Sequence, residues 1–212
     1  MDKVFIFDMD GVIINSEPMH EEIELAVASE LGIKFDRENW EKYVGMRSRD
    51  MWESVKIERQ LSFDVDNILT LADKRKVQYI NTKQIEPING IKELLETLTE
   101  LDYRIGLASS SPKPFIEAVL NKFQISKFYD VVVSGDDIKE GKPAPDIYIE
   151  AARRLAVSPD VCFVLEDSEN GIKAGNAAGM KTIGFKNPAS GTLDLSEAAY
   201  QVRTIEEVLE LI

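Results

Sequence analysis

The stretch KVFIFDMDGVIINSEP, residues 3–18, decides the fold of this chain. It starts with an uninterrupted apolar run, Val4–Phe7, which ends abruptly in Asp8, Asp10 and Gly11. An apolar run of this length predicts a strand that is buried on both faces, as in the parallel sheets of α/β proteins. Ligands of such sheets bind beyond the carboxyl ends of the strands, so we expect the two aspartates at the mouth of a ligand site.

Asp8 and Asp10 are separated by a single residue, and Gly11 allows the chain to turn sharply after them. Two carboxylates this close repel each other unless a positive charge comes between them. A magnesium ion prefers oxygen ligands and often binds one or two carboxylates together with a phosphate, so it fits this pattern. The alternative is that Asp-x-Asp-Gly is only a solvated turn, and residues elsewhere in the chain must decide between the two.

The composition limits the classes of protein to consider. A length of 212 residues allows one domain, or one domain with a large insertion. The net charge of −13 disfavours general binding of nucleic acids, which requires clustered Lys and Arg. No apolar run approaches the roughly 18 residues that a membrane span needs, so we expect no membrane partner.

The single cysteine, Cys162, lies in the apolar run VCFVL and has no second cysteine with which to form an internal disulfide. This favours a packing role for the thiol and a reducing, cytoplasmic environment. The start of the chain, MDK followed directly by a strand, does not resemble a signal peptide and favours the same compartment. Nothing in the sequence requires more than a monomer.

The region between residues 16 and 85 contains helical patterns and no convincing strand. Ser16 and Pro18 are typical of a helix start, and Gly32 of a helix end. Between them, apolar residues recur every fourth position, at Met19, Ile23, Val27 and Leu31. Further helices are expected around 47–60 and 64–80. The region is too long for a simple crossover, so we interpret residues 16–85 as an inserted helical cap domain.

From residue 86 onward, strand and helix patterns alternate. Strands are expected at 103–108, 131–133, 162–165 and 182–185, with amphipathic helices between them. Such alternation predicts an α/β fold with a doubly wound parallel sheet, in which residues 1–15 and 86–212 form one core domain. Thr204 and Glu207 have the spacing of a capping box for a final helix.

Polar residues follow several of these predicted strands: Ser109 after the second, Lys142 beyond the third, and Glu166 with Asp167 after the fourth. In a phosphate-binding site, carboxylates hold a metal ion, a hydroxyl group binds phosphate oxygens and a lysine adds positive charge. The residues after these strands are of those three kinds. Each feature has a plainer interpretation, because Ser109 and Lys142 are ordinary loop residues and the two acids are suited to capping a helix. Their joint occurrence at successive strand ends favours the site.

These segments resemble the haloacid dehalogenase (HAD) superfamily, in the branch that includes β-phosphoglucomutase and small sugar-phosphate phosphatases. The resemblance spans the predicted core from end to end. It is carried by FDMDGVIINSEP at 7–18, LASSS at 107–111, GKPAPDIY at 141–148, LEDSENG at 165–171 and AGM at 178–180. It implies a HAD-like Rossmannoid core with a cap, and it is specific for the superfamily but not for the substrate.

The resemblance also implies roles for the acidic residues. Asp8 would be the nucleophile that accepts the phosphoryl group, and Asp10 the general acid and base. The Mg²⁺ cofactor would be held by Asp8, by the backbone carbonyl of Asp10 and by Asp167, with Glu166 in support. Burial and a neighbouring carboxylate would both raise the pKa of the Asp10 side chain, as an acid catalyst requires.

The remaining roles concern the phosphorylated substrate. The resemblance implies that Ser109, Ser110 and Lys142 bind the transferring phosphate. His20, in the predicted cap, lies where related enzymes have a histidine near the acid/base aspartate, although an exposed helix residue is an equal interpretation. Arg47 and Arg49 either reach the non-transferring part of the substrate or are solvated charges at a helix start.

The leading function is hydrolysis of a small phosphorylated metabolite, a sugar or sugar-alcohol phosphate, through an aspartyl-phosphate. The alternative with the same chemistry is β-phosphoglucomutase. The resembled mutases carry a lysine directly after the Ser-x-Ser segment, where this chain has Pro112 with Lys113 one position later, and they tend to have a lysine where this chain has Val44. Both departures favour a phosphatase.

A third possibility is a non-enzymatic phospho-acceptor domain of a signalling protein. Such domains are about half this length, lack a helical insertion and accept the phosphoryl group on a central strand rather than the first, so this possibility is remote.

Overall fold

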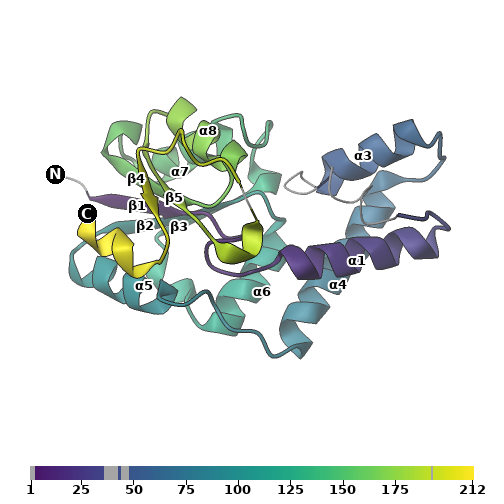
Figure 1. Ribbon diagram of the computed structural model, residues 1–212, viewed down its shortest axis with the longest axis horizontal. Coiled ribbons are helices and arrows are strands. Elements are labelled where there is room, and N and C mark those ends of the chain that lie inside the picture. Colours follow the sequence, from purple (N-terminus) through teal and green to yellow (C-terminus); the bar gives the residue numbers. More distant parts are fainter. Residues whose placement is uncertain (1–2, 36–42, 44–47, 192) are drawn as a thin grey trace. The chain divides into compact units, whose positions relative to one another are not determined.

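The computed structural model describes residues 3–35, 43, 48–191 and 193–212. The chain forms two compact units (Figure 1). The core unit consists of Met1–Glu17 and Ile85–Ile212, and the helical unit consists of Pro18–Gln84.

The core unit contains a six-stranded sheet in which every neighbouring pair is parallel. The strand order is β3-β2-β1-β4-β5-β6, so the first strand of the chain lies in the middle. All four residues of that strand are completely buried, as the apolar run predicts. The strands are β1 (Val4–Phe7), β2 (Arg104–Ser109), β3 (Val131–Ser134), β4 (Cys162–Glu166), β5 (Lys181–Phe185) and β6 (Tyr200–Val202).

Helices cover both faces of this sheet, with α7 and α8 on one side and α5 and α6 on the other (Figure 1). Because helices cover both faces, the central strands are buried on both sides, and their residues are therefore mostly apolar. The predicted doubly wound parallel sheet is confirmed. The α-helices of the core unit are α5 (Ile91–Glu100), α6 (Lys113–Phe123), α7 (Asp146–Arg154) and α8 (Glu169–Ala177). Short 3₁₀ helices are η1 (Ser126–Phe128), η2 (Gly135–Asp137), η3 (Pro159–Val161), η4 (Pro188–Ser190) and η5 (Glu206–Glu210).

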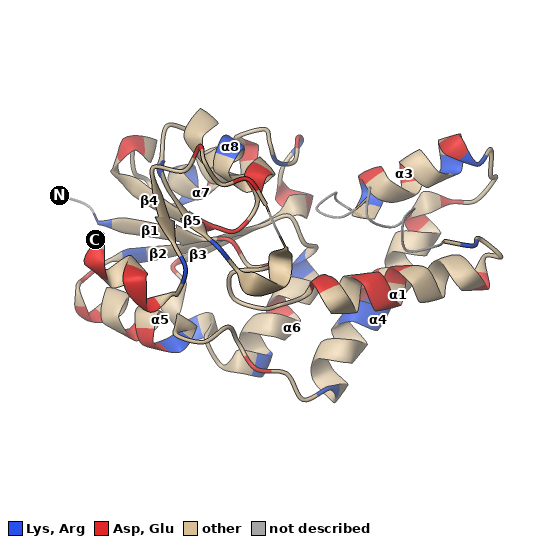
Figure 2. Cartoon of the chain, viewed as in Figure 1, with Lys and Arg blue, Asp and Glu red and all other residues tan. Residues whose placement is uncertain are grey.

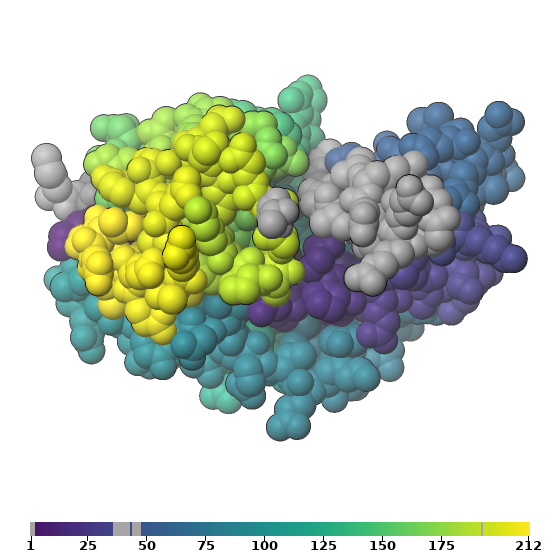
Figure 3. All heavy atoms as spheres, viewed as in Figure 1, coloured from purple at the N-terminus to yellow at the C-terminus, as the bar shows by residue number. Residues whose placement is uncertain are grey.

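Two details at the C-terminal end differ from the sequence prediction. The edge strand β6 was not expected, because two of its three residues are exposed and it lacks an apolar run. The capping box at Thr204 and Glu207 is wrong: η5 begins at Glu206, and the Glu207 carboxylate accepts a hydrogen bond from the Arg203 N–H at 2.8 Å. In Figure 3 this C-terminal part, in yellow, forms much of the visible surface of the core unit.

The helical unit contains α1 (Glu17–Glu30), α3 (Ser48–Glu58) and α4 (Val65–Thr82). The predicted apolar face of α1 is buried at Met19, Ile23 and Val27. Leu31 is an exception, with 43% of its surface exposed, because the helix has ended and Gly32 turns the chain away at a φ of +71°. That this unit serves as a cap stays a prediction.

Acidic residues are spread over the helices of both units, α1 and α5 among them (Figure 2). None of the helices in the described part of the chain combines the length and hydropathy that a bilayer crossing requires.

Candidate active site

The register of the central strands brings acidic side chains together. Phe7 on β1 pairs with Leu107 on β2 and with Leu165 on β4, so the residues that follow these positions are neighbours at the carboxyl edge of the sheet. The ladder continues for one more step, because the Asp8 N–H donates to the Leu165 carbonyl at 3.0 Å. Asp8 therefore lies beside the end of β4.

The carboxylates of Asp8, Glu166 and Asp167 converge there. One carboxylate oxygen of each lies within 4.8 Å of the others, and all three residues are buried. Gly11 permits this approach: it has a φ of +80°, and a β-carbon at this position would lie 1.9 Å from the Asp167 carboxylate. The Asp-x-Asp-Gly segment is thus packed against a third acid and is not a solvated turn.

Lys142, from the loop before α7, enters the same cluster. Its Nζ lies 2.6 Å from Asp8 Oδ1 and 2.6 Å from Glu166 Oε1, and it also lies 3.5 Å from the Ala108 carbonyl. Its side chain is almost completely buried. The structure therefore brings together four of the residues singled out at strand ends in the sequence.

The charges in this cluster are unbalanced, since three carboxylates face one ammonium group. Burial raises the pKa of Asp8 well above its usual range, and the carboxylates of Glu166, Asp10 and Asp167 add to the effect against the opposing charge of Lys142. Burial, together with the Glu166 carboxylate, raises the pKa of Asp167 to about 7. The pKa of Lys142 is also raised, because Asp8 and Glu166 outweigh the opposite effect of burial.

A buried set of carboxylate oxygens with an excess of negative charge is the donor set that a hard divalent cation such as Mg²⁺ prefers. A cation would also offset the cost of ionising Asp8 and Asp167, whose pKa values burial raises. The residues present therefore fit a magnesium ion.

Asp10 has a different environment, formed by serine hydroxyls. Ser16 Oγ donates to Asp10 Oδ1 at 2.5 Å, while Ser111 Oγ and Ser109 Oγ donate to Oδ2 at 2.8 and 3.2 Å. Ser16, expected as a helix cap, thus holds Asp10. Ser111 was missed by the sequence analysis, although it belongs to the same serine run as Ser109.

Ser109 and Ser110, expected to bind phosphate, lie at the end of β2. Ser109 is fully buried, and its hydroxyl also accepts a hydrogen bond from the Ser111 N–H at 3.1 Å. Ser110 follows the strand and is partly buried. Gly135 packs against it so closely that a β-carbon there would lie 2.3 Å from the Ser110 carbonyl oxygen. The loops after β2 and β3 are therefore fixed against each other, and phosphate binding by the two serines stays a prediction.

The three candidate residues of the predicted cap are not assigned to this site by the structure. His20 is on α1 and Arg49 on α3, both in the helical unit, and Arg47 lies outside the described residues. Arg49 makes an ion pair with Asp66 at 2.6 Å. The roles of these three residues stay predictions.

The loop after β5 contributes two polar residues that sequence reasoning missed. Ser190 Oγ donates to Asp167 Oδ2 at 2.6 Å. Asn187 Nδ2 donates to the Gly11 carbonyl at 2.8 Å and to Asn15 Oδ1 at 2.7 Å. The segment NPAS follows a predicted strand, so the reasoning used for the other strand ends could have found both.

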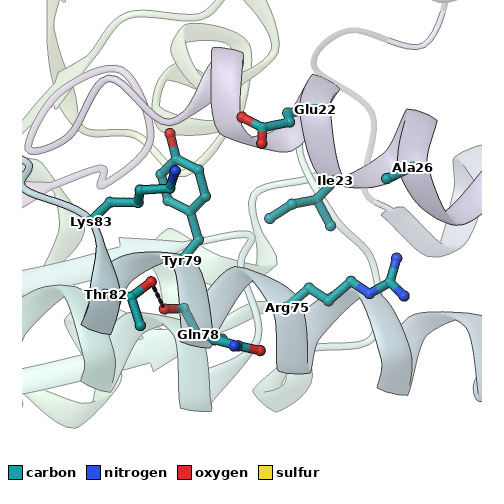
Figure 4. A pocket seen from close by; sticks show the side chains of 8 residues that line it. All are labelled: Glu22, Ile23, Ala26, Arg75, Gln78, Tyr79, Thr82 and Lys83. Atoms are coloured by element: carbon teal, nitrogen blue, oxygen red, sulfur yellow. Dashed lines mark hydrogen bonds between the residues drawn. The ribbon is translucent and has the colours of Figure 1, made fainter.

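A pocket of about 250 Å³ lies within the helical unit, between α1 and α4 (Figure 4). None of the predicted site residues lines it. Its lining consists of Glu22, Ile23 and Ala26 from α1 and Arg75, Gln78, Tyr79, Thr82 and Lys83 from the C-terminal part of α4 and the residue after it.

A doubly wound parallel sheet with a buried cluster of carboxylates and a lysine at its carboxyl edge defines an α/β protein with a metal-competent site. Residues 5–185 match the family described as haloacid dehalogenase-like hydrolase, and the chain belongs to this family. The family predicted from the sequence is confirmed.

Known relatives match over most of this chain. Hexitol phosphatase B of Escherichia coli K12 is 31% identical over 188 residues, which cover 84% of this chain and 81% of the relative. The β-phosphoglucomutase of Bacillus subtilis is 32% identical over 195 residues, covering 86% and 82%. Among solved structures, β-phosphoglucomutase from Clostridium difficile superposes with a TM-score of 0.83 at 28% identity, covering 99% and 96%.

Proposed function

We propose that this protein is a magnesium-dependent phosphohydrolase that cleaves a small sugar or sugar-alcohol phosphate through phosphorylation of Asp8. The observation that carries the proposal is the position of Asp8, whose Oδ1 is 2.6 Å from Lys142 Nζ inside the carboxylate cluster. A carboxylate is repelled by a phosphate dianion, so it can act as nucleophile only where positive charge is concentrated.

Asp8, Glu166 and Asp167 offer the converging carboxylate oxygens that would hold Mg²⁺. The resemblance adds the backbone carbonyl of Asp10 as a further ligand and gives Glu166 a supporting role. When bound, the ion would neutralise charge on the phosphate oxygens and on the carboxylates around them. Ser109, Ser110 and Lys142 would bind the transferring phosphoryl group, and the ammonium of Lys142 would stabilise the charge that its oxygens carry in the transition state.

The first step forms a bond between Asp8 and phosphorus and breaks the bond between phosphorus and the sugar oxygen. Asp10 gives its proton to that leaving oxygen, and the sugar or sugar alcohol departs. In the second step Asp10 takes a proton from water as the water oxygen attacks the phosphorus of the aspartyl-phosphate. The Asp8–phosphorus bond breaks, and inorganic phosphate is released. The Ser16 and Ser111 hydroxyls would keep the Asp10 carboxyl group in one orientation for both proton transfers, while Ser109 turns its single hydroxyl hydrogen to the phosphoryl group.

The similarity to hexitol phosphatase B supports a phosphorylated carbohydrate as substrate. We assign recognition of its non-transferring part to the helical unit acting as a cap, with His20, Arg47 and Arg49 as the candidate contacts. Pro112 and Val44 stand where the resembled mutases tend to have lysines, which favours water over a sugar hydroxyl as the acceptor. Action as a monomer in the cytoplasm is part of the same proposal.

The test is release of inorganic phosphate from a panel of phosphorylated sugars and sugar alcohols in the presence of Mg²⁺. We expect turnover of at least one compound by the unmodified protein and none above background by Asp8→Asn. Equal rates for the two proteins would exclude Asp8 as the nucleophile.

A second candidate is a β-phosphoglucomutase, which the 32% identity with the Bacillus subtilis enzyme favours. Incubation with β-glucose 1-phosphate and a hexose bisphosphate primer separates the two. Inorganic phosphate as the product supports the phosphatase, whereas the isomeric hexose phosphate would show that the protein is a mutase.

A further inference from the structure

Tyr148, in the first turn of α7, is completely buried and makes two contacts with the carboxylate cluster. Its hydroxyl donates to Glu166 Oε1 at 2.9 Å. The face of its ring lies under the ammonium of Lys142, with 5.0 Å between Nζ and the ring centroid. The Tyr148 side chain therefore contacts both Lys142 and Glu166, the acid with which Lys142 forms an ion pair.

All the acceptor sites of the Glu166 carboxylate are occupied by donors from the described residues. Its Oε1 accepts from Lys142 at 2.6 Å and from Tyr148, and its Oε2 accepts from both the N–H and the hydroxyl of Ser168 at 2.9 Å each. An ionised carboxylate offers about four acceptor sites, so these four donors fill them. Gly171 closes the remaining side, where a β-carbon would lie 1.7 Å from Oε1. The Glu166 carboxylate is thus fixed in one orientation.

The ammonium of Lys142 is shared between Asp8 and Glu166 at equal distances of 2.6 Å. A lysine stem is flexible, so the balance between the two acids determines where the charge lies. The Tyr148 hydroxyl donates to the Glu166 oxygen that the ammonium also contacts, and therefore weakens the pull of that oxygen on Lys142. The aromatic face attracts the same ammonium and limits its movement.

We propose that Tyr148 is a positioning residue that holds Lys142 between Glu166 and Asp8, where the ammonium meets the phosphoryl group during transfer. This inference rests on the proposed function, because it concerns the nucleophile and the lysine assigned there. Tyr148 itself does not touch the reacting atoms. If the Tyr148 hydroxyl were removed, Glu166 Oε1 would regain an acceptor site. It would then draw the Lys142 ammonium away from Asp8.

The plainer interpretation is that Tyr148 only fills the core. Its neighbours Ile147, Ala151 and Ala152 belong to the same hydrophobic cluster, and a phenylalanine would fill the space equally well. The two interpretations therefore differ over the hydroxyl alone. Tyr148→Phe removes the hydroxyl and keeps the ring, whereas Tyr148→Leu removes both contacts with the cluster.

The core unit offers a matched control in Tyr129. This tyrosine also has a buried hydroxyl, but the oxygen has no hydrogen-bond partner among the described residues, and its ring packs edge-on against Phe7. Tyr129→Phe therefore removes the same atom from the same unit without removing an interaction with the cluster.

The experiment measures kcat and KM for p-nitrophenyl phosphate with Mg²⁺, together with the melting temperature of each variant. We expect Tyr148→Phe to lower kcat about tenfold with KM within about twofold, because a hydrogen bond to a charged group is lost and its effect falls on the transition state. We expect Tyr148→Leu to lower kcat about 100-fold, since the ring contact is lost as well. Tyr129→Phe should keep the kcat of the unmodified protein within about twofold.

A kcat of Tyr148→Phe equal to that of Tyr129→Phe would overturn the proposal and leave Tyr148 as a core residue. A change in melting temperature alone, without a change in kcat, would overturn it as well. Asp8→Asn is measured in parallel to separate the two claims. If Asp8→Asn is inactive and Tyr148→Phe is fully active, only the positioning role fails, whereas an active Asp8→Asn would remove the proposed function itself.

Discussion

Each unit of this protein contains a buried lysine paired with a glutamate, and the two clusters differ in their charge balance. In the core unit Lys142 contacts Glu166 at 2.6 Å, and in the helical unit Lys76 contacts Glu24 at the same distance. All four side chains are almost inaccessible to solvent. Burial and distance therefore do not distinguish the two pairs.

Among the residues that the structure describes, the cluster in the helical unit balances one acid with one base. Glu24 on α1 accepts from Lys76 on α4, from Ser48 Oγ at 3.1 Å and from Trp52 Nε1 at 2.8 Å, the last two on α3. Lys76 also donates to Ser48 Oγ at 2.9 Å. One acid, one base and their hydrogen bonds join three helices, which is a structural role.

The cluster in the core unit has two carboxylates more than this neutral arrangement. Asp8 and Asp167 lie beside the Lys142–Glu166 pair, and burial raises the pKa of both. This excess of negative charge is the feature expected of a site for a cation, and only with the cation bound would it suit a phosphate as well. In this protein, charge balance therefore distinguishes the candidate site from the structural ion pair.

The largest expected effect comes from removing the lysine of the unbalanced cluster. Lys142→Met should lower kcat for p-nitrophenyl phosphate by about 10²–10³-fold, because a preorganised charge that faces the transferring oxygens is lost. Steady-state kinetics measure it, with Lys173→Met as control, since Lys173 is an exposed lysine of the same unit. Equal activity of both variants would show that Lys142 does not act on the reaction.

Removing the lysine of the neutral cluster should act on stability. Lys76→Met leaves Glu24 charged and buried without a counter-ion, so we expect the free energy of unfolding to fall by about 3–5 kcal/mol in urea titrations. The double variant Glu24→Gln/Lys76→Met has no buried charge and should recover part of that loss. A double variant that is less stable than Lys76→Met would contradict the account.

The raised pKa of Asp167 predicts a pH dependence in the metal-free protein. The folded state keeps a proton on this carboxyl group up to about pH 7, whereas the unfolded chain releases it near 4, so the associated stability is present at low pH and is lost as the pH rises through 7. In EDTA, Asp167→Asn should therefore become more stable than the unmodified protein as the pH rises from 4 to 8.

Chemical unfolding at several pH values measures this difference. Addition of Mg²⁺ should stabilise the unmodified protein at pH 8 and not Asp167→Asn, because the ion favours the ionised carboxylate. A stability difference between the two proteins that is independent of pH would contradict the assignment of the raised pKa.

The smallest effect is expected for an exposed ion pair of the helical unit. The side chains of Arg49 and Asp66 are 51% and 73% exposed, although their atoms approach to 2.6 Å. Arg49→Ala should lower the free energy of unfolding by less than about 1 kcal/mol, since solvent screens the pair. Urea titration of Arg49→Ala and Lys76→Met side by side tests this prediction. Equal losses of unfolding free energy in the two variants would show that burial does not determine how much an ion pair stabilises this protein.

The central part of this structure could be predicted from the sequence because parallel strands end at one edge. Asp8, Glu166 and Asp167 directly follow predicted strands, and parallel strands end together even when they are far apart in the sequence. Lys142 comes from the longer loop beyond the third strand, so the strand ends alone do not place it. The apolar run Val4–Phe7 likewise predicts a central strand, since only a strand covered on both faces is apolar throughout.

The remainder depends on contacts that no local pattern encodes. Glu24 and Lys76 are 52 residues apart, and each alone is typical of a solvated helix face. Tyr148 lies on the apolar face of α7 and looks like a core residue until its hydroxyl is seen to reach Glu166. The short strand β6 is formed by pairing with β5 and not by its own residues, two of which are exposed.

The most direct test of the account is to identify the atom that carries the phosphoryl group. The protein is mixed with Mg²⁺ and a substrate found in the panel, quenched in acid during turnover, and digested for mass spectrometry. We predict a phosphoryl group on Asp8 that is absent from Asp8→Asn. Turnover without any phosphorylated Asp8, or with the label on another residue, would contradict the account.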